Sequence, residues 1–218
     1  IQKERTISDA FDQSSSGESL VNMMDLDLLV GSGGVLSHAP RREQSAKMLI
    51  DAFMPEGITQ LAVDSIFMMP QLGVLANIDK KDLGEEARNA SLEVFHKDCL
   101  IRLGTCIAPI GIVKNGSTVL HAKLTFSDGK VIEKNIKKNE LYRIEAKYDA
   151  IQAELTPHKK MDVGSGIGES IKTTIYGGLV GIIFDGRDRP ISIPSDSKER
   201  LSFLNNWSEA LNEYPKKV

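Results

Sequence analysis

Apolar positions in the first part of this 218-residue chain follow the patterns of short strands and amphipathic helices. Continuous apolar runs at Leu26–Val30 and Ile58–Val63 predict two short buried strands. Between them, one helical face is marked at spacings of three and four by Ala46, Leu49, Ile50 and Phe53. This spacing predicts a helix over Gln44–Phe53, and strands alternating with helices indicate a layered α/β segment.

Two further helices are predicted before residue 100. Asp64 or Ser65 can cap the start of a helix that runs through Met68, Leu72 and Leu75. Because proline lacks a backbone donor, Pro70 predicts a kink or a late start of this helix. The next helix is expected over Gly84–His96. The many methionines of this part are interpreted as core residues.

From about Leu100 the period changes to two, which is typical of strands. Val119–Phe126 and Val131–Glu133 flank the turn Ser127–Lys130 and predict a hairpin. Further strands are predicted at Leu141–Ala146 and Ala150–Leu155, and at Ile171–Tyr176 paired with Leu179–Phe184. Short strands at this spacing predict a small β-barrel or sandwich.

An amphipathic helix is predicted over Lys198–Tyr214, with a buried face formed by Leu201, Leu204, Trp207, Ala210 and Leu211. The chain is therefore divided into an α/β segment at 1–98, a β-rich, barrel-like module at 99–196 and a C-terminal helix at 197–218. Charge supports two modules, because residues 1–100 carry 9 basic against 16 acidic residues and residues 101–218 carry 18 against 14. Two solvated surfaces of differing composition explain the same asymmetry.

Composition excludes several classes of protein. The hydrophobic content of 41% and the charged content of 26% are those of a globular protein. No apolar run reaches the roughly 18 residues of a membrane span, and the basic excess is too small for nucleic-acid binding, so neither partner is expected. With only two cysteines, Cys99 and Cys106, a cytoplasmic location is expected.

The segment with the clearest chemistry is Asp25–Pro40, DLDLLVGSGGVLSHAP. Its apolar run ends in the loop Gly31–Gly34, and a helical pattern follows, so that backbone N–H groups can approach a phosphate or a nucleotide. The loop has neither the GxxxxGK[ST] nor the GxGxxG spacing, which excludes a P-loop and a dinucleotide fingerprint. A purely structural turn is the alternative interpretation.

Together with AVDSIFMMPQLGVLA, EVFHKDCLIRLGTCIAPIG, MDVGSG and GGLVGIIFDGRDRPISIP, in this order, the segment resembles the C-terminal part of the MutL (glutamate mutase L) family. The resemblance extends from Asp25 to Pro215. It implies an actin-like ATPase fold for the first segment and an association with adenosylcobalamin-dependent aminomutases such as methylaspartate mutase. The implied role is that of a reactivating chaperone, which uses ATP to release damaged cobalamin.

The resemblance also implies a nucleotide site. In actin-like ATPases a strand–Gly-Gly–helix unit contacts the adenosine, which makes Gly31, Ser32, Gly33 and Gly34 the candidate contacts, bordered by Ser37 and His38. ATP and Mg²⁺ are the implied cofactors of the full-length protein. Subunits of the mutase are the implied partners, and a homo-oligomer is a further possibility.

The two Asp-x-Gly phosphate loops of that superfamily do not precede Asp25. We therefore expect a C-terminal fragment that binds nucleotide weakly and does not hydrolyse ATP by itself, and no catalytic residue is assigned. A non-catalytic scaffold, or an interaction module in which the β-rich part contacts a partner, is the alternative function.

Other candidate sites are weaker. His96, Cys99 and Cys106 supply three metal-ligand types without a paired CxxC motif, so two buried cysteines are preferred to a metal site or a Cys–His nucleophile. Asp162–Gly164 is interpreted as a turn and Gly164–Gly168 as a loop. Arg187–Pro190 is interpreted as a solvated, charged hairpin.

Overall fold

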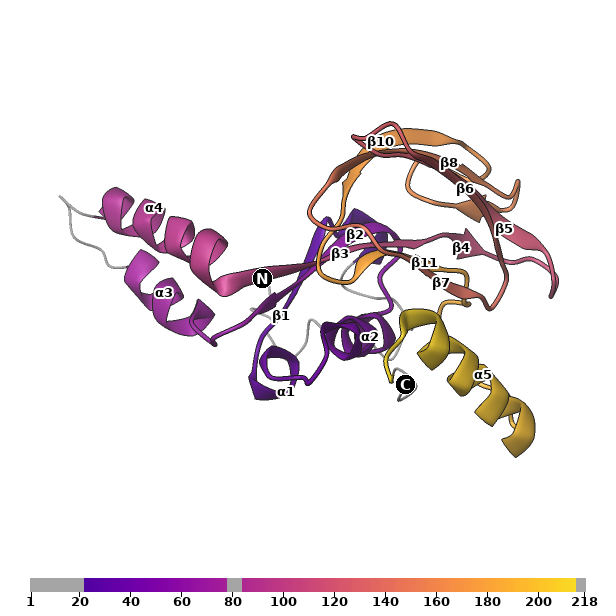
Figure 1. Cartoon of the computed structure of the whole chain (residues 1–218), viewed down its shortest axis with the longest axis horizontal. Helices are drawn as coiled ribbons and strands as arrows, with labels where there is room; N and C mark the ends of the chain where they lie inside the picture. The colour runs from indigo at the N-terminus through magenta and orange to yellow at the C-terminus, as the bar shows by residue number, and fades with distance from the viewer. Residues whose placement is uncertain (1–21, 78–83, 215–218) are drawn as a thin grey trace, which may run out of the picture.

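The computed structural model describes residues 22–77 and 84–214, arranged in three layers (Figure 1). The middle layer is a mixed sheet in the order β1-β2-β3-β11-β7. Its strands are β1 (Leu28–Gly31), β2 (Gly57–Asp64), β3 (Leu100–Ala108), β11 (Gly181–Asp185) and β7 (Leu141–Ile144). The pairs β1–β2 and β3–β11 are parallel, whereas β2–β3 and β11–β7 are antiparallel.

A second, antiparallel sheet covers one face of this mixed sheet (Figure 1). Its order is β10-β8-β5-β6, formed by β10 (Ile171–Tyr176), β8 (Ala150–Pro157), β5 (Thr118–Thr125) and β6 (Val131–Lys137). A short pair, β4 (Ile110–Gly111) and β9 (Met161–Asp162), lies beside the two sheets. The predicted hairpin is confirmed, since β5 pairs with β6 in antiparallel register around Ser127–Lys130.

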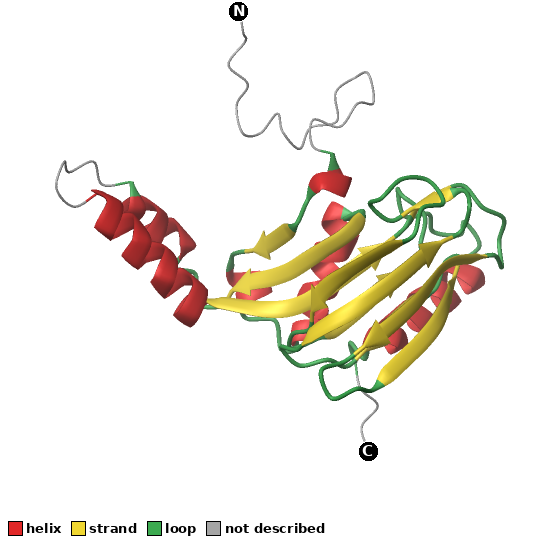
Figure 2. Ribbon diagram, turned by 90° about the horizontal axis from the view of Figure 1, so that it is seen from above, coloured by secondary structure: helices red, strands yellow, loops and turns green. Residues whose placement is uncertain are grey.

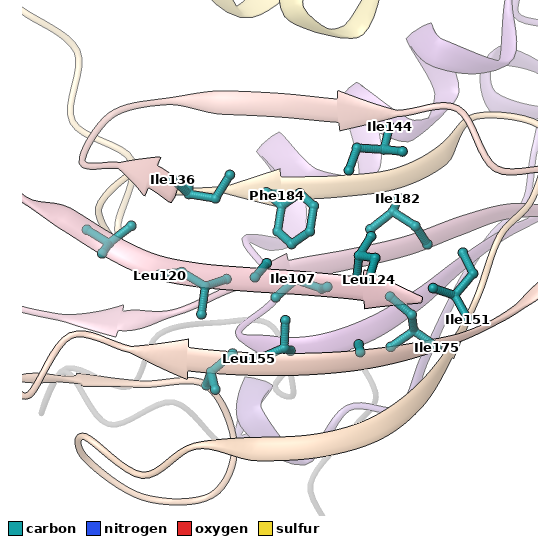
Figure 3. Packing of buried hydrophobic residues seen from close by; sticks show 14 of the residues in the cluster. Ile107, Leu120, Leu124, Ile136, Ile144, Ile151, Leu155, Ile175, Ile182 and Phe184 are labelled. Carbon is teal, nitrogen blue, oxygen red and sulfur yellow. The ribbon is translucent and has the colours of Figure 1, made fainter. Parts of the chain in front are cut away.

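The core between the sheets consists of aliphatic side chains and one phenylalanine (Figure 3). Ile182 and Phe184 from the mixed sheet face Leu120, Leu124 and Leu155 from the second sheet. The period-2 pattern of β8 explains this packing, because Ile151, Ala153 and Leu155 are buried and the residues between them are exposed.

The helices α2 (Arg42–Phe53) and α5 (Ser197–Leu211) cover the other face of the mixed sheet (Figures 1 and 2). A second core forms there, in which α2 contributes Ala46, Leu49 and Ile50, as its spacing predicted. From α5, Trp207 and Leu211 are buried, but Leu201 is 60% exposed. The predicted buried face of this helix is therefore wrong in its first turns, which extend past the sheet.

Two helices, α3 (Met69–Ala76) and α4 (Gly84–Val94), project away from the layers (Figure 2). The late start predicted from Pro70 is confirmed, because α3 begins at Met69 and holds the proline in its first turn, where a missing donor costs little. A π-helical turn, Phe95–Cys99, then leads into β3. Only Leu72 of α3 and Ser91 of α4 are buried, so this pair of helices has little core of its own.

Of the barrel or sandwich predicted for the later strands, the barrel is wrong, since the described residues form separate sheets, two of which pack face to face. β10 and β11 do not pair with each other, because Gly177–Leu179 carries the chain from the second sheet to the mixed sheet. β1 is an edge strand, not a buried one, and Leu28 is 40% exposed.

The mixed sheet also crosses the boundary predicted between residues 98 and 99. β2, from the first predicted segment, pairs with β3 over Gly57–Asp64, and β3 pairs with β11 on its other side. Residues 1–21 of the first segment lie outside the described residues.

Candidate functional site

The glycine loop lies at the carboxyl end of β1, next to the carboxyl end of its parallel neighbour β2. Gly31 pairs with Val63 at the end of the ladder, and α1 (Gly34–Ser37) follows the loop as a single helical turn. Ligands of open α/β sheets bind outside the carboxyl ends of parallel strands. The position of the predicted loop is therefore suitable for a ligand.

The glycines of this loop have different roles. At Gly31 a Cβ atom would lie 2.8 Å from Leu36 Cδ1 and 2.9 Å from Leu49 Cδ2, so this glycine allows the loop to pack on α2. Gly33, just before α1, has a φ of 104° that other residues rarely adopt. At Gly33 and Gly34 a Cβ atom would meet no heavy atom within 4 Å. The space where a Cβ atom would lie is therefore open at both positions, and Gly34 is exposed, which leaves room for a ligand.

Both serines of the predicted site are hydrogen-bonded to Asp64, the last residue of β2. Ser32 Oγ donates to Asp64 Oδ2 at 3.2 Å, and the buried Ser37 donates its hydroxyl to the Asp64 backbone oxygen. Ser37 thus connects the two strand ends inside the protein and is not available to a ligand. Ser32 is half-buried and borders the open glycines.

Asp64 is fully buried and connects the glycine loop to α3. Besides the Ser32 hydroxyl, its carboxylate accepts the backbone N–H groups of Met68 at 3.1 Å and Met69 at 2.8 Å. The N-cap residue of α3 is Met68, so the predicted N-cap at Asp64 or Ser65 is wrong, although the Asp64 carboxylate accepts two N–H groups at the start of the helix. Its bond to Ser32 was not foreseen, because nothing in the sequence indicates that β1 and β2 are parallel neighbours.

Exposed apolar side chains surround the strand ends. Val35 in α1 is 74% exposed, and the exposed Ile66 and Phe67 follow Ser65, the residue after Asp64. Phe67 is 47% exposed and has a φ of 58°, which is unusual for an aromatic residue and is favoured here because its neighbours are bonded to Asp64. His38, the last predicted site residue, is exposed at the end of α1.

The residues weighed as a metal or nucleophile site are not suited to either role. His96 is exposed, whereas Cys99 and Cys106 are buried. Burial raises the pKa of Cys106 to about 12, so its thiol stays protonated at neutral pH. No group of three metal-ligating side chains occurs among residues 22–77 and 84–214.

The charged segment after β11 is buried, so its interpretation as a solvated hairpin is wrong. Asp185 is fully buried and Arg187 is 97% buried, and Arg187 Nε and Nη2 each lie 2.8 Å from the Asp185 carboxylate. Arg189 Nη2 donates to the same carboxylate at 2.9 Å. Asp162, by contrast, accepts the N–H groups of Gly164 and Gly166, which confirms the predicted turn.

Comparisons with known proteins give one match. The model of a family described as MutL protein matches residues 2–89, which include the glycine loop, Asp64 and α3. No curated protein and no solved structure matches the chain. In the described part of the chain, no helix has the length and apolarity needed to cross a membrane. Residues 2–89 of the chain are therefore similar to the MutL family.

Proposed function

We propose that this chain is part of a MutL-type component that acts with an adenosylcobalamin-dependent glutamate (methylaspartate) mutase. The observation that carries the proposal is the family match over residues 2–89. Within that segment the glycine loop has the sequence and the strand-end position of an adenosine-contacting element. We infer an actin-like ATPase relationship from this local arrangement, and a reactivating, chaperone-like role toward the mutase follows from the same relationship.

The open space beside Gly33 and Gly34 would accept one side of an adenine nucleotide. Val35, the next residue in the chain, and Ile66, two residues after Asp64, expose apolar surface. A nucleotide bound here would carry its Mg²⁺ on its own phosphates, since Mg²⁺ keeps most of its waters and takes few protein ligands. The chain's residues would orient the adenosine.

Hydrolysis requires a group that positions water and stabilises charge on the γ-phosphate. The Asp64 carboxylate is hydrogen-bonded to the loop through Ser32, but it is buried and already accepts three hydrogen bonds inside the protein. It therefore supports the loop and is not placed to act on a phosphate. We expect adenine-nucleotide binding without turnover by this chain alone.

A non-catalytic interaction module is the second candidate. It is favoured by the projecting helices α3 and α4, which expose Val74, Leu75, Leu92 and Val94. Exposed apolar side chains gathered on one projection are typical of protein–protein contacts. In this case the mutase or another subunit would bind whether or not nucleotide is present.

Calorimetry with ATP and ADP tests the nucleotide site, with Gly34→Leu as the variant. The matched control is Gly73→Leu in α3, because a Cβ atom at Gly73 also meets no heavy atom within 4 Å. We expect weak binding that is lost only in Gly34→Leu. Equal binding by both variants would contradict the site.

A pull-down with the mutase, with and without ATP, tests the partner. Binding that depends on ATP and is lost in Gly34→Leu supports the reactivase-like role. Binding that is unaffected by ATP and by Gly34→Leu supports the interaction module. No binding either with or without ATP contradicts the association.

A further inference from the structure

A cavity of about 360 Å³ is lined by β2 and β3 of the mixed sheet and by β10 of the second sheet. This volume is within the range of small-molecule sites in proteins. None of the residues that line it belongs to the glycine loop. The cavity is therefore separate from the proposed nucleotide site and does not depend on it.

Part of the cavity lining is apolar. Ile58 from β2, Ile171 and Ile175 from β10, and Met24 from the turn before β1 contribute to it. These side chains belong to or adjoin the core between the sheets. An aliphatic group of a ligand would gain by leaving water here, at roughly 25 cal/mol per Å² of buried apolar surface.

Three polar side chains of the lining have no hydrogen bond or ion pair in the described structure: Asp27, Gln60 and Thr173. Their neighbours differ, because Thr105 is bonded to the backbone of Tyr176 and Thr174 to Gln152. Backbone pairing places Asp27 beside Gln60, whose N–H donates to the Asp27 carbonyl at 2.8 Å. Polar groups without partners beside apolar side chains are the arrangement by which ligand pockets orient a ligand.

The charge of the lining limits the ligand. Among the described residues, Asp27 is the only ionisable side chain of the lining, which includes neither lysine nor arginine. A phosphate or carboxylate would lie near a negative charge with no cation to pair with. An ammonium group would pair with Asp27, and the Gln60 amide oxygen would accept a second hydrogen bond.

We propose that this cavity is a binding site for a small molecule with a short aliphatic body and an ammonium head group. The body packs on Ile58, Ile171 and Ile175, and the head lies between Asp27 and Gln60. Thr173 closes the site from the second sheet. Specificity follows from the negative lining, which accepts cations, takes neutral analogues more weakly and rejects anions.

Protein-observed NMR with the full chain and three probes tests the proposal. The probes are hexylammonium, hexanol and hexanoate, which share one aliphatic body and differ in the charge of the head. We expect saturable shifts of the Gln60 side-chain amide and the Thr173 methyl group with hexylammonium, roughly tenfold weaker binding of hexanol, and none of hexanoate. Equal binding of all three, or no binding of hexylammonium, would overturn the proposal.

Variants distinguish residues that line the cavity from residues elsewhere on the surface. Asp27→Asn should weaken hexylammonium binding about tenfold, since it removes a charge-assisted hydrogen bond. The matched control is Asp25→Asn, which changes an exposed carboxylate that does not line the cavity. Thr173→Trp should fill the cavity and abolish binding, whereas Lys172→Trp on the same strand should not. An unchanged affinity in Asp27→Asn would exclude the assigned head-group position.

Discussion

Two segments at the ends of mixed-sheet strands differ in exposure in the opposite sense to their charge. The loop Gly31–Gly34 has no charged residue, yet Gly34 is exposed and Gly33 is half-buried. The segment Asp185–Pro190 carries four charges, and its first residues are buried in the core. Charge density along the chain is therefore a poor guide to exposure where opposite charges can pair.

The buried segment ties three elements together. Arg187 binds Asp185 in its own loop and Asp51 in α2 at 2.8 Å, and its guanidinium lies 4.9 Å from the ring centre of Trp207 in α5. Arg189 donates to the Pro55 carbonyl that follows α2. Around the glycine loop, Ser32 and Ser37 of α1 are hydrogen-bonded to Asp64. The segment Asp185–Pro190 thus connects helices to the sheet, whereas the glycine loop leaves Gly34 exposed.

The largest effect that we expect is on stability, from Arg187→Ala. The variant leaves the Asp185 carboxylate buried with one cation fewer, and removing one partner of a buried ion pair costs about 3–5 kcal/mol. Urea unfolding followed by circular dichroism measures the loss. The control is Lys172→Ala, which breaks the exposed pair with Glu154 and should cost less than about 1 kcal/mol. Similar losses in both variants would contradict the buried role of Arg187.

The same ion pairs predict how stability depends on pH. Burial alone raises the pKa of Asp185, but the hydrogen bonds and charges of Arg187 and Arg189 outweigh it and hold the pKa below its usual value. The pairing therefore stabilises the fold fully above the unfolded pKa of about 4, and this contribution is lost as the pH falls through the lower folded pKa. Urea midpoints between pH 7 and pH 2 should fall less steeply in Asp185→Asn than in the wild type. Parallel curves would show that another carboxylate is responsible.

In the glycine loop, alanine should destabilise the fold much more at Gly31 than at Gly34. Gly31→Ala brings a methyl group into contact with Leu36 and Leu49, and such overpacking costs about 1–3 kcal/mol. Gly34→Ala meets open space at the first residue of α1 and should change stability by less than about 1 kcal/mol. Thermal unfolding of both variants distinguishes the packed glycine from the open one. A loss at Gly34 as large as that at Gly31 would show that the open glycine is also structural.

The smallest effect is expected from Ser32→Ala. Asp64 loses one of the three donors to its carboxylate but keeps those at Met68 and Met69, so a cost of about 1 kcal/mol is expected. Amide hydrogen exchange at Met68 and Met69 should become faster, because Asp64 is less firmly held. If exchange changes only in α1, the connection from the loop to α3 through Asp64 is not functional.

Local patterns in the sequence predicted the elements well. The spacing of Ala46, Leu49 and Ile50 predicted the buried face of α2, and Pro70 predicted the late start of α3. These features depend on residues close together in the chain, so propensity and periodicity are sufficient to find them.

Partners distant in sequence could not be found in this way. Nothing near β2 indicates that its neighbours are β1 and β3, and nothing near Arg187 indicates Asp51, which lies 136 residues away. In the candidate site, too, the local features could be predicted and the long-range contacts could not. Its glycines were evident in the sequence, but the contact of Ser32 with Asp64 depends on a parallel pairing that only the fold provides.

Because β2 pairs with β3, the segment that matches the family is shorter than the segment that completes the mixed sheet. The MutL match ends at residue 89, inside α4, yet β2 acquires its second neighbour only at Leu100–Ala108. A polypeptide cut at the end of the match would retain α2 but lose the β3 and β11 side chains that complete the core beneath it. During synthesis, the sheet that carries the glycine loop can therefore be completed only after β11, its last strand in the sequence, has been made.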